Sequence, residues 1–146
     1  MRINYLLLVH TTQNIKRLIS RLWDENSFFY VHIDSKKELG EFKRETIGFS
    51  NVKFVFEREN VIWGDMSMVK ATLALINQVK NDCSENCYNI LISGSDYPIK
   101  PKESIRKFFT NNYGKIFLSS RCVDEVILNR RCKPIRVDVD AVLILK

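Results

Sequence analysis

The sequence predicts an α/β domain built on a mostly parallel sheet with helices on both faces. Two observations predict this class: short apolar segments recur along the 146 residues, and amphipathic helical patterns separate most of them. A near-continuous apolar segment is typical of a strand buried on both faces, and helices between such strands imply parallel pairing through right-handed crossovers. The composition, 45% hydrophobic and 27% charged, is that of a globular domain and excludes wholesale disorder.

The first half of the chain alternates strands with helices. Its apolar runs predict strands at 3–9, 28–33 and 52–56. A helix capped by Thr11 or Thr12 is expected to reach Trp23. The apolar residues that repeat at helical spacing within it are Ile15, Leu18, Ile19 and Leu22. The polar residues 38–46 are expected to form a short helix.

The second half continues the alternation after a loop at 57–64. Asp65 or Ser67 caps the next predicted helix, which runs to Lys80. Its expected apolar stripe consists of Val69, Leu73, Ile76 and Val79. The later elements predicted are a strand at 88–92, a turn at 93–98, a helix at 102–111 with Ile105, Phe108 and Phe109 on one face, a strand at 115–119 and another strand within 134–145.

The net charge of +6 is concentrated at the C-terminal end, because residues 101–146 contribute 10 basic and 5 acidic groups. Such a segment is a candidate contact for phosphates, nucleic acid or anionic lipid, and a solvated face is the simpler interpretation. No aromatic residues interleave with its arginines, so we expect no nucleic-acid partner. The longest early apolar run, Tyr5–Val9, is too short to span a bilayer or to form a signal-peptide core.

The four cysteines are not spaced as zinc ligands. Cys83 and Cys87 form a CxxxC pair, whereas Cys122 and Cys132 stand alone. We therefore expect reduced thiols in a cytoplasmic protein.

Candidate functional residues follow the predicted strands. Ligands of parallel α/β sheets bind beyond the carboxyl ends of the strands, and there the chain places His10, Asp34, Trp63, Asp96 and Tyr97. An aromatic ring and carboxylates suit a base and the hydroxyls of a ribose. Simpler interpretations stay open, namely a core histidine at position 10, turn residues at 34 and 96, and a core tryptophan at 63.

Several common motifs are absent or misplaced. The sequence contains no GxGxxG, GxxxxGK[ST], HExxH or GxSxG. His32 lies inside a predicted strand and is expected to be structural. Asp138 and Asp140 spell DxD, a pattern that holds a metal–diphosphate in many sugar-nucleotide transferases. Here they alternate with Val137 and Val139, which indicates the solvent face of a strand.

Four segments in this order and spacing resemble one family. They are Tyr5–His10, Tyr30–Lys36, Val61–Ser67 and Leu91–Lys100, of which the last, LISGSDYPIK, is the most specific. Together they resemble the core-2/I-branching β-1,6-N-acetylglucosaminyltransferase family, which includes the peptide O-xylosyltransferases. The resemblance covers residues 3–119.

The resemblance implies a GT-A-like, Rossmann-type domain that transfers a sugar, usually N-acetylglucosamine, from a UDP-sugar to a glycan hydroxyl. The transfer would be inverting and independent of a metal, and the acceptor would be a glycan or a lipid-linked saccharide. Carried over by segment, the donor site would include Leu8, Val9, His10, Asp34, Ser35, Lys36, Trp63, Asp96 and Tyr97. In keeping with metal independence, the turn after the fourth strand carries one aspartate, not two.

Catalysis by this family also needs a glutamate base and basic residues that meet the leaving diphosphate. No motif identifies either here, although Glu125 and the basic residues Arg130, Arg131, Lys133 and Arg136 follow the last matched segment. We therefore expect a nucleotide-sugar-binding half at 1–119, a divergent basic segment at 120–146, and an N-terminal part of a longer enzyme. A non-catalytic remnant that binds a UDP-sugar or a partner is the alternative. A peripheral contact with an anionic inner membrane surface is a further expectation, which sedimentation with anionic vesicles would test.

Overall fold

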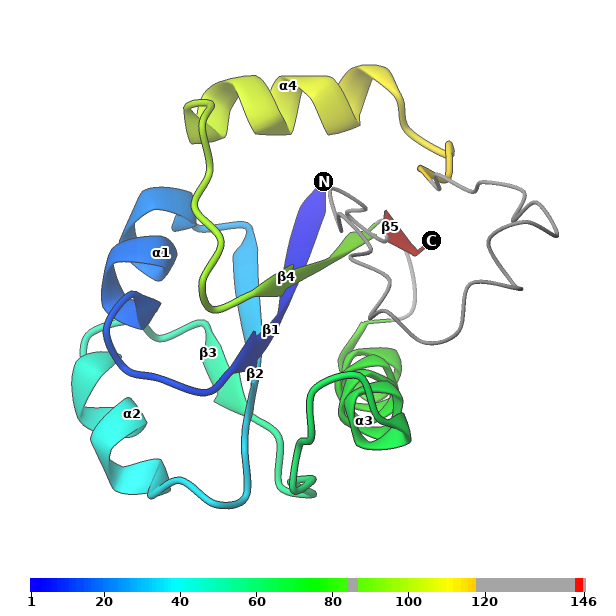
Figure 1. Ribbon diagram of the computed structural model, residues 1–146. Coiled ribbons are helices and arrows are strands. Elements are labelled where there is room, and N and C mark those ends of the chain that lie inside the picture. The colour runs from blue at the N-terminus through cyan, green and yellow to red at the C-terminus, as the bar shows by residue number, and fades with distance from the viewer. Residues whose placement is uncertain (84–86, 118–143, 146) are drawn as a thin grey trace, which may run out of the picture.

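A computed structural model describes residues 1–83, 87–117 and 144–145 (Figure 1). Strands and helices alternate along the chain, as the sequence predicts. Their bounds are β1 Arg2–Val9, α1 Ile15–Leu22, β2 Ser27–Ile33, α2 Leu39–Glu45, β3 Val52–Phe54, α3 Met66–Asp82, β4 Cys87–Ser93, α4 Lys102–Asn111 and β5 Ile144–Leu145.

One sheet organises the molecule, with the strand order β3-β2-β1-β4-β5. β1 pairs in parallel with β2 on one side and with β4 on the other, and β3 pairs in parallel with β2. Among the described strands β5 alone runs antiparallel, against Asn89 and Ile90 of β4. The arrangement confirms the predicted Rossmann-type α/β class with a mostly parallel sheet.

Helices cover both faces of this sheet, because the side chains of β1 alternate between two cores (Figure 1). Ile3, Tyr5 and Leu7 pack with the buried side of α1 and with Phe109 of α4. Leu6 points to the opposite face, where it packs with Leu75 and Val79 of α3. The central strand is therefore buried on both faces, as its continuous apolar sequence predicts.

The predicted stripe of α1 is confirmed, but its predicted start is wrong. Ile15, Leu18, Ile19 and Leu22 are all buried. The helix begins at Ile15 after Asn14, and Thr11 instead accepts a hydrogen bond from the backbone N–H of Gln13 within a preceding turn. A hydroxyl at position 11 thus closes a local turn, which competes with capping for the same side chain.

The predicted stripe of α3 is wrong in part. Val69 and Leu73 are about half exposed (49% and 51%), and the buried face consists of Ser67, Ala71, Leu75 and Val79. The helix carries apolar residues around most of its circumference, so periodicity alone does not identify the face that meets the sheet. The predicted cap is confirmed, because the Asp65 carboxylate accepts a hydrogen bond from the N–H of Ser67 at 3.2 Å.

The C-terminal predictions are tested only at their ends. Residues 115–117 form no strand beyond a single bridge at Phe117, and the remainder of the strand predicted at 115–119 lies outside the described residues. Of the strand predicted within 134–145, residues 144–145 form β5. Asp138, Asp140, Glu125, Cys122, Cys132 and the basic cluster at 130–136 also lie outside the described residues.

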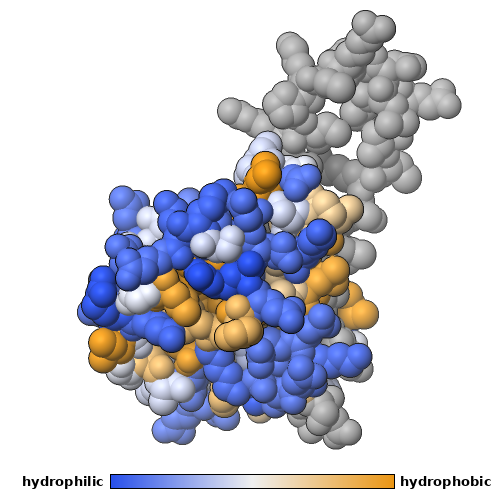
Figure 2. Space-filling model, turned by 90° about the horizontal axis from the view of Figure 1, so that it is seen from below, coloured by the Kyte–Doolittle hydropathy of each residue, from blue (hydrophilic) through white to orange (hydrophobic). Residues whose placement is uncertain are grey.

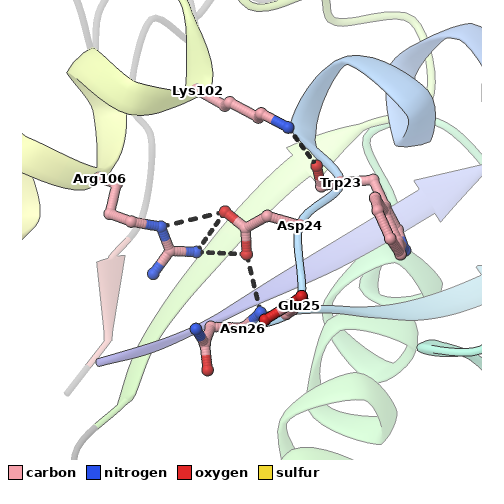
Figure 3. A pocket seen from close by; sticks show the side chains of 6 residues that line it. All are labelled: Trp23, Asp24, Glu25, Asn26, Lys102 and Arg106. Carbon is pink, nitrogen blue, oxygen red and sulfur yellow. Dashed lines mark hydrogen bonds and ion pairs between the residues drawn. The ribbon is translucent and has the colours of Figure 1, made fainter.

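At the amino ends of the strands, α4 is tied to the turn that precedes β2 (Figure 3). The Arg106 guanidinium donates to both carboxylate oxygens of Asp24, with its Nη2 at 2.6 Å from each. Lys102 Nζ donates to the carbonyl of Trp23 at 2.9 Å. Burial raises the pKa of Asp24, but the hydrogen bonds from Arg106, Asn26 and Ser27 outweigh it, so this pKa lies below its ordinary value.

Within the part of the chain that the structure describes, no helix is long and apolar enough to cross a membrane. Cys83 and Cys87, at the end of α3 and the start of β4, are both thiols in the structure. Burial, followed by a hydrogen bond with Cys83, raises the pKa of the Cys87 thiol to about 11.

Candidate functional site

The strand order reverses between β1 and β4. The chain proceeds from β1 to β2 and β3 on one side, then crosses so that β4 pairs with the other side of β1. In open α/β sheets, the loops that leave such a switch point diverge and create a crevice beyond the carboxyl ends of the strands. Here those loops begin after Val9 and Ser93.

A cavity of about 1480 Å³ lies at this edge. It is lined by side chains of β1 and β4, by His32 of β2 and Asp34 after it, by α1, α3 and α4, by the loop before α3, and by the turn after β4. Figure 2 views the molecule from the side on which the strands end and shows apolar side chains exposed there among hydrophilic ones. The space and the mixed lining suit a ligand with both a ring and polar groups.

Seven of the nine predicted site residues line this cavity, namely Leu8, Val9, His10, Asp34, Trp63, Asp96 and Tyr97. Ser35 and Lys36 do not. His10 and Trp63 are exposed, so the alternative interpretations of a core histidine and a core tryptophan are wrong.

Asp34 directly follows β2, lines the cavity and is 6% exposed. Its Oδ1 accepts the backbone N–H of Lys36 at 2.9 Å, and its Oδ2 lies 3.3 Å from Lys36 Nζ. Burial raises the pKa of Asp34, but the backbone and side-chain hydrogen bonds from Lys36 outweigh it, so the pKa is lowered and the group is a carboxylate at neutral pH. Asp34 therefore also closes a turn, and its remaining acceptor capacity is what a ligand could use.

Lys36 joins the turn after β2 to the loop at 57–64. Its Nζ donates to the carbonyl of Val61 at 2.8 Å while it faces Asp34. The N–H of Ser35 donates to the carbonyl of Glu59 at 3.0 Å. Both residues thus hold the loop from outside the cavity, which explains why neither lines it.

The turn after β4 is closed by its own aspartate. Asp96 Oδ2 accepts the N–H of Ser93 at 2.7 Å, and the N–H of Asp96 donates back to the carbonyl of Ser93 at 3.0 Å. Gly94 donates its N–H to the carbonyl of Leu8 at 2.8 Å, which extends the β1–β4 pairing to the rim of the cavity. Asp96 therefore closes a turn, as one interpretation predicted, and also lines the cavity.

Sequence reasoning missed several residues of this edge. The guanidinium of Arg17 in α1 lies 4.2 Å from the ring centroid of Tyr97, a cation–π contact that ties α1 to the turn. Met68, Val69 and Thr72 of α3 also line the cavity. In the sequence, Met68 and Val69 appear only as apolar residues of a helix, which does not distinguish the cavity from the core. The expected stripe had placed Val69 in the core.

No cluster of three or more histidine, cysteine, aspartate or glutamate side chains that could hold a metal ion occurs among residues 1–83, 87–117 and 144–145.

Fold and cavity together define a Rossmann-type α/β domain with a cavity at its switch point. The family comparison is specific: the model of the Core-2/I-Branching enzymes matches residues 3–144. The chain belongs to this family of glycosyltransferases, which confirms the resemblance seen in the sequence.

Its relatives include xylosyltransferases. A xylosyltransferase of Ciona intestinalis is 28% identical over 123 residues, and human xylosyltransferase 2 is 30% identical over 126 residues. Both alignments cover 82% of this chain, whereas the chain covers 14% of either relative. Xylosyltransferase sqv-6 of Caenorhabditis elegans is 27% identical over 112 residues, or 74% of this chain.

Proposed function

We propose that this chain is the donor-binding part of an inverting, metal-independent glycosyltransferase that uses a UDP-sugar and transfers the sugar to a hydroxyl of a glycan or lipid-linked saccharide. The observation that carries the proposal is the cavity at the β1–β4 switch point, which gathers Asp34, Trp63, Asp96 and Tyr97. In this proposal the rings of Trp63 and Tyr97 are available for stacking, and the carboxylates accept hydrogen bonds from ribose or sugar hydroxyls.

Two donor sugars are candidates. The family resemblance favours UDP-N-acetylglucosamine, and the relatives named above are xylosyltransferases. Both UDP-sugars share the nucleotide that this edge is proposed to bind, so UDP alone tests the donor site before either sugar is compared.

A non-catalytic UDP-sugar-binding domain is the second candidate. The observation that favours it is the state of the two carboxylates in the cavity lining. Asp34 accepts the N–H of Lys36, and Asp96 accepts the N–H of Ser93. A general base must be able to take a proton from the acceptor hydroxyl, and both groups are stabilised in turns instead.

Titration with UDP in the presence of EDTA tests the donor site. We expect saturable binding by calorimetry without a divalent cation, and a loss of at least about tenfold in affinity in Asp34→Ala and Trp63→Ala, because each removes a polar or stacking contact. Transfer or hydrolysis of UDP-N-acetylglucosamine and UDP-xylose then separates an enzyme from a binding domain.

Matched controls come from the same chain. Asp82 pairs with Lys53 at 2.7 Å outside the cavity lining, so Asp82→Ala removes an equivalent ion pair. Phe56 is 94% exposed and does not line the cavity, so Phe56→Ala removes an exposed ring. Both controls should bind UDP as the unmodified chain does; equal losses in controls and site variants would contradict the proposed site.

A further inference from the structure

His32 lies inside β2, is 1% exposed and lines the cavity, and its side chain is hydrogen-bonded to a loop outside the sheet. Its Nε2 accepts the backbone N–H of Glu59 at 2.9 Å. A ring nitrogen that accepts a hydrogen bond carries no proton, so the imidazole is neutral with its proton on Nδ1. The bond joins β2 to a loop 27 residues later in the chain.

That loop is fixed at successive residues. Glu59 is held on both sides of its backbone, by His32 at its N–H and by the N–H of Ser35 at its carbonyl. Two residues later, Lys36 Nζ binds the carbonyl of Val61. The N–H of Ile62 then donates to the hydroxyl of Ser67 at the start of α3, at 2.9 Å.

Trp63 follows directly on these anchors. It is 77% exposed and lines the cavity, so packing of the ring itself does little to fix its position. The position of the Trp63 ring therefore depends on the backbone that precedes it. Of the anchors, the one from His32 is the most buried, since the Lys36 side chain is 52% exposed.

We propose that His32 is a positioning residue of the donor site: its neutral imidazole holds Glu59, and through it the loop that presents Trp63 to the nucleotide. This inference rests on the proposed function, because it assumes that the cavity binds a UDP-sugar. Protonation of Nε2 replaces the acceptor by a donor and breaks the bond to Glu59.

The surroundings of His32 define the direction of a pH effect. Burial lowers the pKa of His32, the carboxylates of Asp34 and Glu59 raise it, the guanidinium of Arg58 lowers it, and the net pKa lies below its ordinary value of 6.5. On β1 the register partner of His32 is the apolar Leu8. The lysines of α3, Lys70 and Lys80, are exposed. The imidazole is thus neutral at pH 7, and acidification breaks its bond to Glu59 while the bonds of the loop to Ser35, Lys36 and Ser67 remain.

Two substitutions of His32 separate its role as a hydrogen-bond acceptor for Glu59 from its protonation. Gln in His32→Gln carries an amide oxygen at about the position of Nε2 and does not titrate, whereas His32→Leu removes the acceptor and keeps a similar volume. The ligand is UDP-N-acetylglucosamine in EDTA, because its diphosphate has no group that titrates near neutral pH. His10, which also lines the cavity, is present in all variants.

We expect the affinity of the unmodified chain to fall by about tenfold as the pH is lowered from about 7.5 through the lowered pKa of His32, where the imidazole becomes charged. His32→Gln should bind as tightly as the unmodified chain at the higher pH and lose most of that dependence. His32→Leu should bind about tenfold more weakly at the higher pH. Amide exchange at Glu59 without ligand should be faster in His32→Leu than in His32→Gln.

The outcomes distinguish the two levels of the proposal. If the unmodified chain binds no UDP-sugar, the proposed function fails and the positioning role fails with it. If it binds and His32→Leu binds equally well, or His32→Gln keeps the full pH dependence, only the role of His32 is overturned. Should His32→Leu not fold, the pH profiles of the unmodified chain and His32→Gln still decide.

Discussion

Gly94 directly follows β4 and lies against Val9 at the end of β1, at the rim of the cavity. A β-carbon built at this position would lie 3.1 Å from both methyl carbons of Val9 and 3.3 Å from its Cα. Those distances are tighter than ordinary van der Waals contact, and a neighbouring strand cannot move away without loss of its pairing. The glycine is thus required by space at the rim of the site.

We expect Gly94→Ala to lower the free energy of unfolding by about 1–3 kcal/mol, because the added methyl overpacks the β1–β4 contact. Urea unfolding measures the change. Gly40→Ala is the matched control: its β-carbon would lie 3.4 Å from the flexible Glu38 side chain, within α2. Alanine favours helix there, so this control should be unchanged or up to about 1 kcal/mol more stable. A fully stable Gly94→Ala would show that β1 and β4 can separate.

Helix α4 reaches the sheet partly through one ion pair at the edge opposite the cavity. Arg106 binds both oxygens of Asp24 (Figure 3). It also donates to the carbonyl of Met1, so one side chain joins α4 to the residue before β1 and to the turn before β2. Bidentate geometry makes such a pair stronger than a typical surface contact. Both side chains are about a quarter exposed, so water still screens it.

Loss of this pair should loosen α4. We expect Arg106→Gln to lower the free energy of unfolding by about 1 kcal/mol after allowance for that screening. Lys107→Ala, which removes an exposed cation of the same helix, should change little. A double-mutant cycle with Asp24→Asn gives the coupling energy, and additive losses would show that the pair contributes no interaction of its own.

Acid should destabilise the whole molecule through several carboxylates. Asp24, Asp34 and Asp82 all have a pKa below the ordinary 3.8, each with burial opposed by hydrogen bonds. A lowered pKa in the folded state means that the unfolded chain binds more protons, so stability rises with pH in this range. Their contribution is complete above pH 3.8 and is lost as the pH falls through the lower folded values.

The carboxylates should therefore make the urea midpoint fall steadily below about pH 4, in addition to the loss that the lowered pKa of His32 causes as the pH falls below its ordinary 6.5. Asp82→Asn should flatten this fall in part, because it removes the carboxylate that Lys53 pairs at 2.7 Å. The exposed Glu57 provides a control, as Glu57→Gln should leave the profile as it is. A midpoint that does not change between about pH 5 and pH 3 would contradict the sign of these shifts.

The sequence by itself predicted the α/β class, the family, and seven of the cavity residues. Near-continuous apolar runs such as 3–9 are typical of strands buried on both faces, and strand ends in a parallel sheet share one edge. His10, Asp34 and Asp96 follow such strands directly, so their place at this edge needs no knowledge of packing. The local sequence pattern was sufficient to predict the position of a residue wherever chain order and strand direction determine that position.

Only the tertiary structure decided which surfaces meet. Apolar residues surround most of α3, so contact with β1 and β2 selected Ala71, Leu75 and Val79 for burial and left Val69 on the cavity. Ser35 and Lys36 turned away from the cavity because the carbonyls of Glu59 and Val61, distant in sequence, bind them. His32 gained its bond to Glu59 for the same physical reason: hydrogen bonds between remote segments leave no periodicity in the chain that could predict them.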